Sequence, residues 1–74
     1  MSWAALPPGV RAAAEASCTP RQLQALRYAA AGASTRHVAK LMGISRASAR
    51  EHLSRAHAKI ADHIEKETHA STAE

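Results

Sequence analysis

A chain of 74 residues forms one small domain, and a chain this short buries only a limited share of its surface. It has one Trp, one Tyr and no Phe, so alanine and aliphatic side chains must fill the core. One cysteine excludes an intramolecular disulfide and fits a reducing compartment. The lack of a long apolar run argues against a membrane span and against a secretory signal. The formal net charge of +4 favours a polyanionic partner.

The N-terminal residues give weak structural signals. The Leu-Pro-Pro-Gly run at residues 6–9 predicts an extended, non-helical lead-in. Residues 10–16 are strong helix formers that can add a short helix of two turns. Trp3 either stays disordered or covers the apolar surface of Leu23 and Leu26.

The first clear helix start is a capping box. Thr19 is the N-cap, Pro20 takes the first helical position, and Gln22 reaches back to the cap. This pattern predicts a helix that runs to about Ala31 and ends at Gly32, where glycine permits a left-handed exit.

Two more helices follow. Ser34 caps a short second helix, which ends at Gly43. Ser45 caps a third helix, which contains neither glycine nor proline and can reach residue 67. No segment alternates with a period of two, so no sheet is expected. The predicted fold is all-α: a small helix-turn-helix bundle of three core helices, with a long C-terminal recognition helix and a short N-terminal helix.

The second and third helices flank a turn of about three residues, which is the arrangement of a helix-turn-helix unit. Gly43 permits the positive φ of the turn, Ile44 fills the corner, and Ala39 is small where the helices approach. The side chains expected to face inward are Val38, Leu41 and Met42 on the second helix and Ala49, Leu53, Ala56 and Ile60 on the third.

Positive charge is concentrated on this motif. Residues 21–59 hold eight Lys and Arg against Glu51 alone, whereas residues 60–74 hold one Lys against four acidic residues. Such a distribution indicates phosphate binding. The alternative is that these side chains only solvate helix surfaces.

Many positions agree in register with one known pattern: Thr19-Pro20-Arg21-Gln22, Gly32, Val38-Ala39, Leu41, Ile44-Ser45, Ser48-Ala49-Arg50, His52 and Lys59-Ile60. This pattern resembles the LuxR-type (GerE-type) DNA-binding domain of bacterial transcriptional regulators over residues 18–60. It is also similar to region four of sigma factors, which shares the fold, and residues 53–60 are similar to the end of that region.

The resemblance implies a transcription regulator of the winged-helix-like superfamily, of bacterial or phage origin. It puts Ser48 at a phosphate-binding threonine, Arg50 at a base-reading lysine and His52 at a largely structural histidine. In this geometry the recognition helix, residues 45–60, lies in the major groove of double-stranded DNA. The base contacts predicted are Arg46, Ala47, Arg50, Glu51 and Ser54. The phosphate contacts predicted are Ser34, Thr35, Arg36, Lys40, Ser45, Ser48 and Arg55.

Three residues depart from the family pattern. Gln22 replaces the usual glutamate, and Ala49 and Ala56 replace a valine and an isoleucine, so the core is smaller than the family's. The family's short fourth helix, often its dimer contact, has no clear counterpart, because the third helix runs on.

The apolar stripe of the third helix continues to Ile64, beyond the three-helix core. Either the N-terminal segment or a second subunit must cover it. We expect a homodimer, with Leu53, Ile60 and Ile64 at the contact.

Metal binding and catalysis are not expected. The last four histidines are five or six residues apart, so no two share a helix face at the spacing of four that a metal site needs. No nucleophile with a base and no glycine-rich phosphate loop is present, and Cys18 is expected to be a small packed residue. No cofactor is predicted, and the chain is not expected to be an enzyme.

The sequence therefore predicts a DNA-binding domain at residues 18–67, between a partly flexible arm at residues 1–17 and a frayed tail at residues 68–74. The expected protein is a cytoplasmic, nucleoid-associated regulator without a sensor domain. The alternative is an interaction module similar to sigma region four, which contacts RNA polymerase or another regulator. Salt-sensitive duplex binding would distinguish the two.

Overall fold

The computed structural model describes residues 3–72, with the side chains of residue 4 and residues 68–72 left aside. It contains a short 3-10 helix, η1 (Trp3–Ala5), followed by α1 (Pro8–Ser17), α2 (Pro20–Ala30), α3 (Thr35–Met42) and α4 (Arg46–Thr72). These residues contain no strand, which confirms the predicted all-α bundle with its long C-terminal helix. None of the described helices is long and apolar enough to span a membrane.

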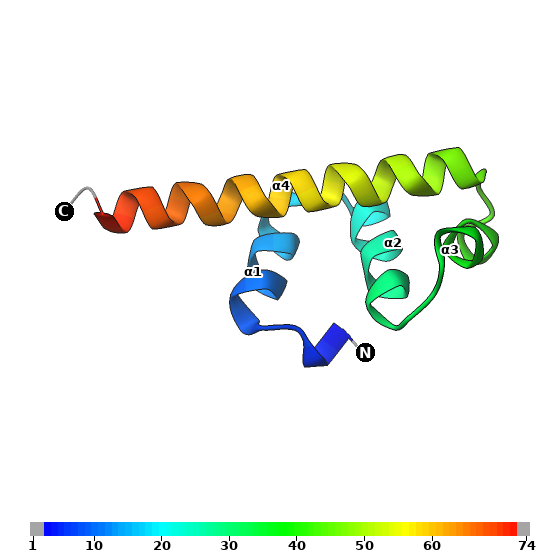
Figure 1. Ribbon diagram of the computed structural model, residues 1–74, viewed down its shortest axis with the longest axis horizontal. Coiled ribbons are helices and arrows are strands. Elements are labelled where there is room, and N and C mark those ends of the chain that lie inside the picture. The colour runs from blue at the N-terminus through cyan, green and yellow to red at the C-terminus, as the bar shows by residue number, and fades with distance from the viewer. Residues whose placement is uncertain (1–2, 73–74) are drawn as a thin grey trace.

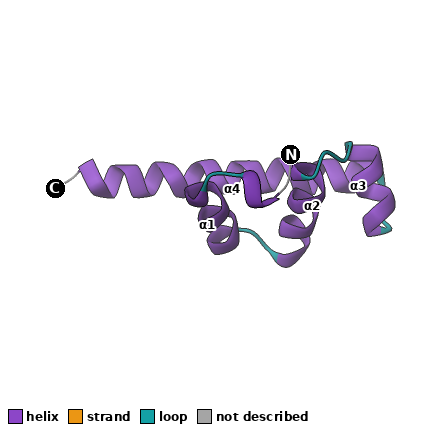
Figure 2. Ribbon diagram, turned by 90° about the horizontal axis from the view of Figure 1, so that it is seen from below, coloured by secondary structure: helices purple, strands orange, loops and turns teal. Residues whose placement is uncertain are grey.

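The long helix α4 organises the molecule. The other three helices lie along one side of it, and α4 contacts each of them (Figure 1). The view turned by 90° shows the same order along α4, from α3 near its start to α1 beyond its middle (Figure 2). The molecule is elongated as a result, with extents of 46 × 23 × 16 Å.

The capping box at the start of α2 forms as predicted. The Thr19 hydroxyl accepts a hydrogen bond from the Gln22 backbone N–H at 3.2 Å, and Gln22 Oε1 accepts one from the Thr19 backbone N–H at 3.0 Å. Gln22 is only 5 % exposed, and its Oε1 also accepts a hydrogen bond from Lys59 Nζ at 3.0 Å. One buried amide therefore joins the start of α2 to α4.

The turn between α3 and α4 also matches the prediction. Ser34 caps α3 by accepting a hydrogen bond from the His37 backbone N–H at 3.2 Å. Gly43 ends the helix with φ 67° and ψ 35°, a left-handed conformation that strains any residue with a Cβ. The Ile44 N–H then donates to the Ala39 carbonyl at 3.0 Å, which closes the helix end.

The core contains two small clusters, and alanine supplies half of the first and most of the second. The first cluster consists of Ala13, Ala14, Leu26 and Ile60, and the second of Ala25, Val38, Ala39 and Ala49. Ala49 and Ala56 are completely buried, Ile60 is buried and Leu53 is half-buried, so the inward stripe predicted for α4 is observed. Small side chains let the helices pack closely at the expense of apolar area.

The predicted inward position of Leu41 is wrong, because its side chain is 47 % exposed. Successive residues turn by about 100° around a helix, which puts Val38, Ala39 and Met42 on one arc. Leu41 lies outside that arc, on the side away from Ala39. Because α3 is short and packs through this arc, Leu41 stays exposed to solvent.

The prediction that residues 6–9 are non-helical is also wrong in part. Pro8 is the first residue of α1 and Gly9 the second, with Pro7 as the N-cap. The Pro7 carbonyl accepts the N–H groups of Val10 and Arg11 at 3.0 and 3.2 Å, so the first turn is closed. Proline is tolerated there because the N–H groups of a first turn have no partner within the helix. The short helix expected at residues 10–16 is therefore present and slightly longer.

Trp3 covers the core rather than standing apart from it. It packs against the first cluster together with Leu23, and Leu26 belongs to that cluster. The Arg27 guanidinium lies over the Trp3 ring, 5.3 Å from its centroid, which is within the range of a cation–π contact. Cys18 packs against the same cluster, as expected for a small apolar residue.

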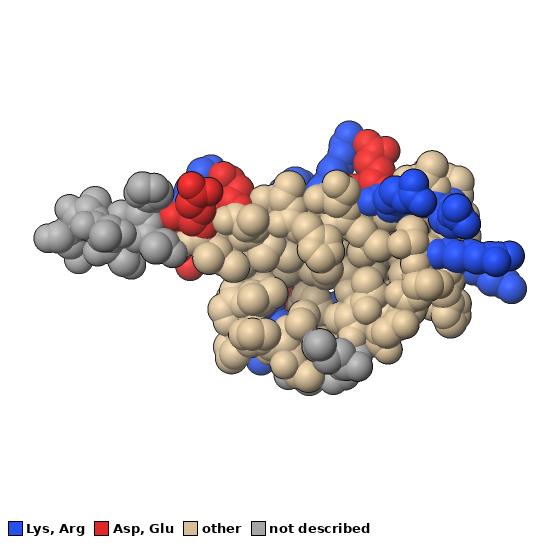
Figure 3. All heavy atoms as spheres, in the orientation of Figure 1, with Lys and Arg blue, Asp and Glu red and all other residues tan. Residues whose placement is uncertain are grey.

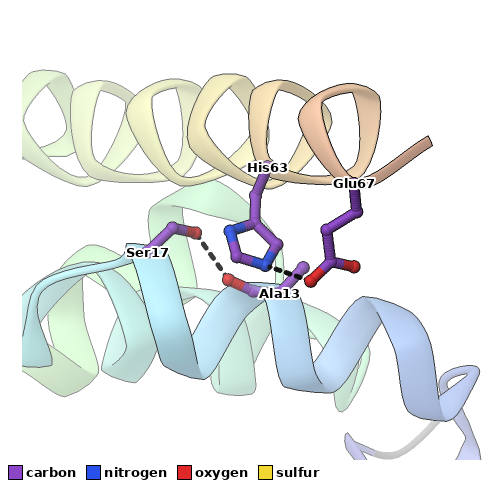
Figure 4. A network of polar contacts seen from close by, with 4 residues as sticks. All are labelled: Ala13, Ser17, His63 and Glu67. Atoms are coloured by element: carbon purple, nitrogen blue, oxygen red, sulfur yellow. Dashed lines mark hydrogen bonds and ion pairs between the residues drawn. The ribbon is translucent and has the colours of Figure 1, made fainter. Parts of the chain in front are cut away.

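The C-terminal half of α4 packs on α1 and then extends beyond it (Figure 1). Figure 4 shows His63 of α4 beside α1, near Ala13 and Ser17, with its Nε2 3.1 Å from Glu67 Oε1. The tail predicted from residue 68 is helical as far as Thr72, because neither glycine nor proline interrupts it. Residues 1–2 of the predicted arm and residues 73–74 of the predicted tail lie outside the described residues.

Candidate nucleic-acid interface

The N-terminal half of α4 presents an exposed polar face opposite its buried alanines. In residues 46–55 of this half of α4, the exposed side chains are Arg46, Ala47, Arg50, Glu51, Ser54 and Arg55. All of them except Arg46 line one shallow depression. The structure therefore brings four of the five predicted base contacts together with Arg55, and Arg46 lies at the first residue of the helix.

Ser45 and Ser48 are joined at the start of this face. The Ser48 backbone N–H donates to Ser45 Oγ at 3.0 Å, and the Ser45 hydroxyl donates to Ser48 Oγ at 2.9 Å. Since Ser48 Oγ acts as an acceptor, its own hydroxyl proton can be donated to another group, such as a phosphate oxygen.

The first turns of α3 form a second polar surface. Ser34, Arg36, His37, Lys40 and Leu41 line one depression, and Thr35 is half-buried beside it. His37 is not among the predicted contacts, although it follows Arg36 and lies within one turn of the cap. Leu41 is not among them either, because its exposure depends on how α3 packs.

Basic residues gather at the end of the molecule formed by α3 and the start of α4, whereas acidic residues gather along the second half of α4 (Figure 3). Two basic residues of segment 21–59 serve other contacts: Arg27 stacks on Trp3, and Lys59 bonds Gln22. The basic cluster predicted from the sequence is therefore not one surface. Among the described residues, no three His, Cys, Asp or Glu side chains are grouped to hold a metal ion.

Glu51 is paired with Arg55 one turn along α4. Its Oε1 lies 2.6 Å from Arg55 Nη2, and the two side chains remain 60 % and 65 % exposed, respectively. Glu51 is the one acidic residue of segment 21–59, so the basic face contains a single carboxylate.

The three predicted dimer residues differ in burial. Ile60 is 8 % exposed and belongs to the first core cluster, so its side chain packs within its own chain. Leu53 is half-buried against the second cluster. Ile64 is 38 % exposed. It lines an apolar pocket of about 430 Å³ together with residues of the N-terminal segment, α1, α2 and α4, among them Leu6 and Val10.

A short capped helix, a left-handed glycine and a longer helix with an exposed basic face define the helix-turn-helix class of DNA-binding domains. The family model described as bacterial regulatory proteins, luxR family, matches residues 16–67. The chain therefore belongs to this family of DNA-binding transcription regulators, which confirms the resemblance found in the sequence. No curated protein and no solved structure gives a match.

Proposed function

We propose that this chain is a sequence-specific transcriptional regulator that binds duplex DNA with the N-terminal half of α4 in the major groove. The observation that carries the proposal is the exposed face of α4 opposite its buried alanines, where Arg50 and Arg55 line one depression, with Arg46 exposed at the first residue of the helix. A major groove admits one α-helix, and arginine is the side chain best suited to its acceptors. Arg36 and Lys40 of α3 add positive charge beside this face.

Two groups of residues carry the two parts of recognition. Base edges are read by Arg46, Ala47, Arg50, Glu51 and Ser54. Phosphates are bound by Ser34, Thr35, Arg36, Lys40, Ser45, Ser48 and Arg55. In helix-turn-helix proteins the first helix crosses the backbone while the start of the second meets the bases, which supports this division.

The test is duplex binding measured at several salt concentrations, followed by selection from random-sequence duplexes. The double variant Arg46→Gln/Arg50→Gln should bind far more weakly than the wild type. The matched control is Arg21→Gln/Lys66→Gln, which removes the same charge from exposed positions on α2 and the far half of α4. Equal losses in both variants would show that only net charge matters, and the proposed interface would be wrong.

A second candidate function is an interaction module similar to sigma region four, which contacts RNA polymerase or another regulator. The exposed Leu41 favours it, because an apolar side chain among basic residues fits a protein surface better than a phosphate backbone. A pure protein adaptor would show no salt-sensitive duplex binding.

We also propose that two copies assemble on DNA, with Ile64 near the contact. Leu6 and Val10 share the lining of its pocket, yet 38 % of Ile64 remains exposed. A partner helix could cover this area, and two domains related by a two-fold axis would read two half-sites. Such a regulator acts on chromosomal DNA, so we propose a cytoplasmic, nucleoid-associated location.

A further inference from the structure

We infer that Glu51 is a specificity-determining residue that selects a cytosine in the bound duplex, and that Arg55 is its positioning residue. The inference rests on the proposed function and names the DNA chemistry that the same face would select. Glu51 is a carboxylate in the depression that Arg50 and Arg55 also line.

The ion pair fixes one carboxylate oxygen and leaves the other available. Arg55 Nη2 engages Glu51 Oε1 at 2.6 Å, and Glu51 is 60 % exposed, so its remaining acceptor sites face solvent. A guanidinium has five N–H donors, so Arg55 can hold Glu51 and still reach a phosphate. The ion pair therefore restricts the orientations of the Glu51 side chain, while both side chains keep hydrogen-bonding groups for DNA.

Protein stability does not explain this pair. Exposed ion pairs contribute little to the free energy of unfolding, and both side chains are more than half exposed. The carboxylate also opposes DNA binding in general, because it repels phosphates from the middle of a basic face. This repulsion is offset only where the DNA sequence offers the carboxylate a hydrogen-bond donor. The repulsive group therefore creates specificity for that sequence.

The chemistry of the major groove identifies the base. Guanine presents two acceptors there, and thymine presents an acceptor and a methyl group, so both disfavour a carboxylate. Adenine presents an amino donor beside the N7 acceptor, and the repulsion from N7 offsets part of the attraction of the carboxylate to the amino group. Cytosine presents its N4 amino donor alone. A carboxylate that reaches the base edges therefore prefers cytosine.

The experiment is selection from random-sequence duplexes by the full chain, with the wild type, Glu51→Gln and Glu15→Gln compared. Glu15 is an exposed acid on α1, so its variant makes the same charge change away from the interface. The wild-type consensus should contain one cytosine whose replacement weakens binding by about five- to a hundredfold. Glu51→Gln should lose that cytosine, or replace it with adenine, which a glutamine amide can bind through N6 and N7. Glu15→Gln should keep it.

The outcomes separate the two proposals. If the wild type enriches no sequence and shows no salt-sensitive binding, the proposed function fails. If it enriches a sequence that Glu51→Gln leaves unchanged, the proposed function stands and the role of Glu51 is wrong.

The positioning role of Arg55 has its own readout. Arg55→Gln should reduce the preference at the same cytosine, and should have no further effect on that preference when Glu51→Gln is already present. A residue that only binds phosphate would weaken all duplexes alike. An unchanged cytosine preference in Arg55→Gln would therefore overturn the positioning role. Circular dichroism should show unchanged helix content in each variant, since both side chains are exposed.

Discussion

Arg50 and Arg36 carry the same charge on different helices, and we expect them to contribute differently to DNA binding. Arg50 lies on the exposed face of α4, directly after the buried Ala49. Its long side chain can present two donors to guanine O6 and N7. Arg50→Ala should therefore cost about 1–3 kcal/mol of binding free energy at one base pair and flatten the preference there. Titration of a set of singly substituted duplexes measures this effect.

Arg50→Lys serves as the control, because lysine keeps the charge but lacks the planar fork. It should retain most of the salt dependence and part of the preference at that base pair, because a lysine ammonium also donates to guanine O6 and N7 but lacks the fixed fork of arginine. If Arg50→Ala instead weakens every duplex by the same factor, Arg50 contacts a phosphate and another residue reads the base.

Arg36 should act through the phosphate backbone. It lies in the first turn of α3 and is exposed beside Lys40. Arg36→Ala should weaken all duplexes alike and reduce the slope of log K against log salt by about 1, because one fewer counterion is released. Ser48→Ala is a useful comparison, since a neutral hydroxyl contact should lower affinity without changing the slope. An unchanged slope in Arg36→Ala would exclude the contact.

At the scale of the helices, the sequence predicts most starts and stops because caps are local. Thr19, Ser34 and Gly43 act through hydrogen bonds and φ angles within a few residues, and each does so as expected. The Pro-Pro-Gly run predicts a non-helical start, whereas α1 begins at Pro8, because proline at a first helical position costs little.

The candidate site was predictable to a similar extent. The exposed face of α4 is the complement of its apolar stripe, so its residues follow from helical periodicity. The contacts of Arg27 with Trp3 and of Lys59 with Gln22 could not be predicted, because the partners are far apart in the sequence. The same is true of Leu41, whose exposure depends on the packing of α3.

The contact between α2 and α4 gives a prediction about stability. Gln22 Oε1 accepts hydrogen bonds from the Thr19 N–H and from Lys59 Nζ. Gln22→Glu restores the usual residue of the family and makes both bonds charge-assisted, beside the positive end of the α2 dipole. We expect the free energy of unfolding to rise by about 1 kcal/mol at neutral pH. Urea unfolding followed by circular dichroism measures it.

Lys59 supplies the control for this prediction. In a Lys59→Met background, Gln22→Glu should stabilise much less or destabilise, because a buried carboxylate would lose its cationic partner. In the wild-type background the gain should disappear in acid, where the new carboxyl is protonated. If Gln22→Glu raises the free energy of unfolding equally with and without Lys59, the capping box alone explains the effect.

At the scale of the whole molecule, α4 links a basic end to an acidic end. Its start lies beside α3 in the basic region, and its second half extends past α1 with most of the acidic residues (Figures 1 and 3). A polyanion is attracted to the first end and repelled from the second. DNA should therefore approach near α3, which leaves the region of Ile64 accessible to a second copy.

The geometry of α4 is compatible with a dimer on DNA. Arg50 and Ile64 are separated by about 21 Å along the helix axis, at a rise of about 1.5 Å per residue. A two-fold axis near Ile64 would put the two Arg50 residues at most about 42 Å apart. Inclined helices shorten this distance toward the roughly 34 Å that separates half-sites one turn apart on one face of a duplex.

Ile64→Asp tests this assembly. A charge at the contact should prevent dimer formation while leaving the monomer folded, because Ile64 is 38 % exposed. Ala12→Asp is the matched control, since it puts the same charge at an exposed residue of α1 that lines neither the pocket of Ile64 nor the two depressions of the proposed interface. Sedimentation with a palindromic duplex should show two copies bound for Ala12→Asp and one for Ile64→Asp. If the wild type itself binds the palindrome as a single copy, the N-terminal segment with Leu6 and Val10 is sufficient cover for Ile64, and the dimer proposal is wrong.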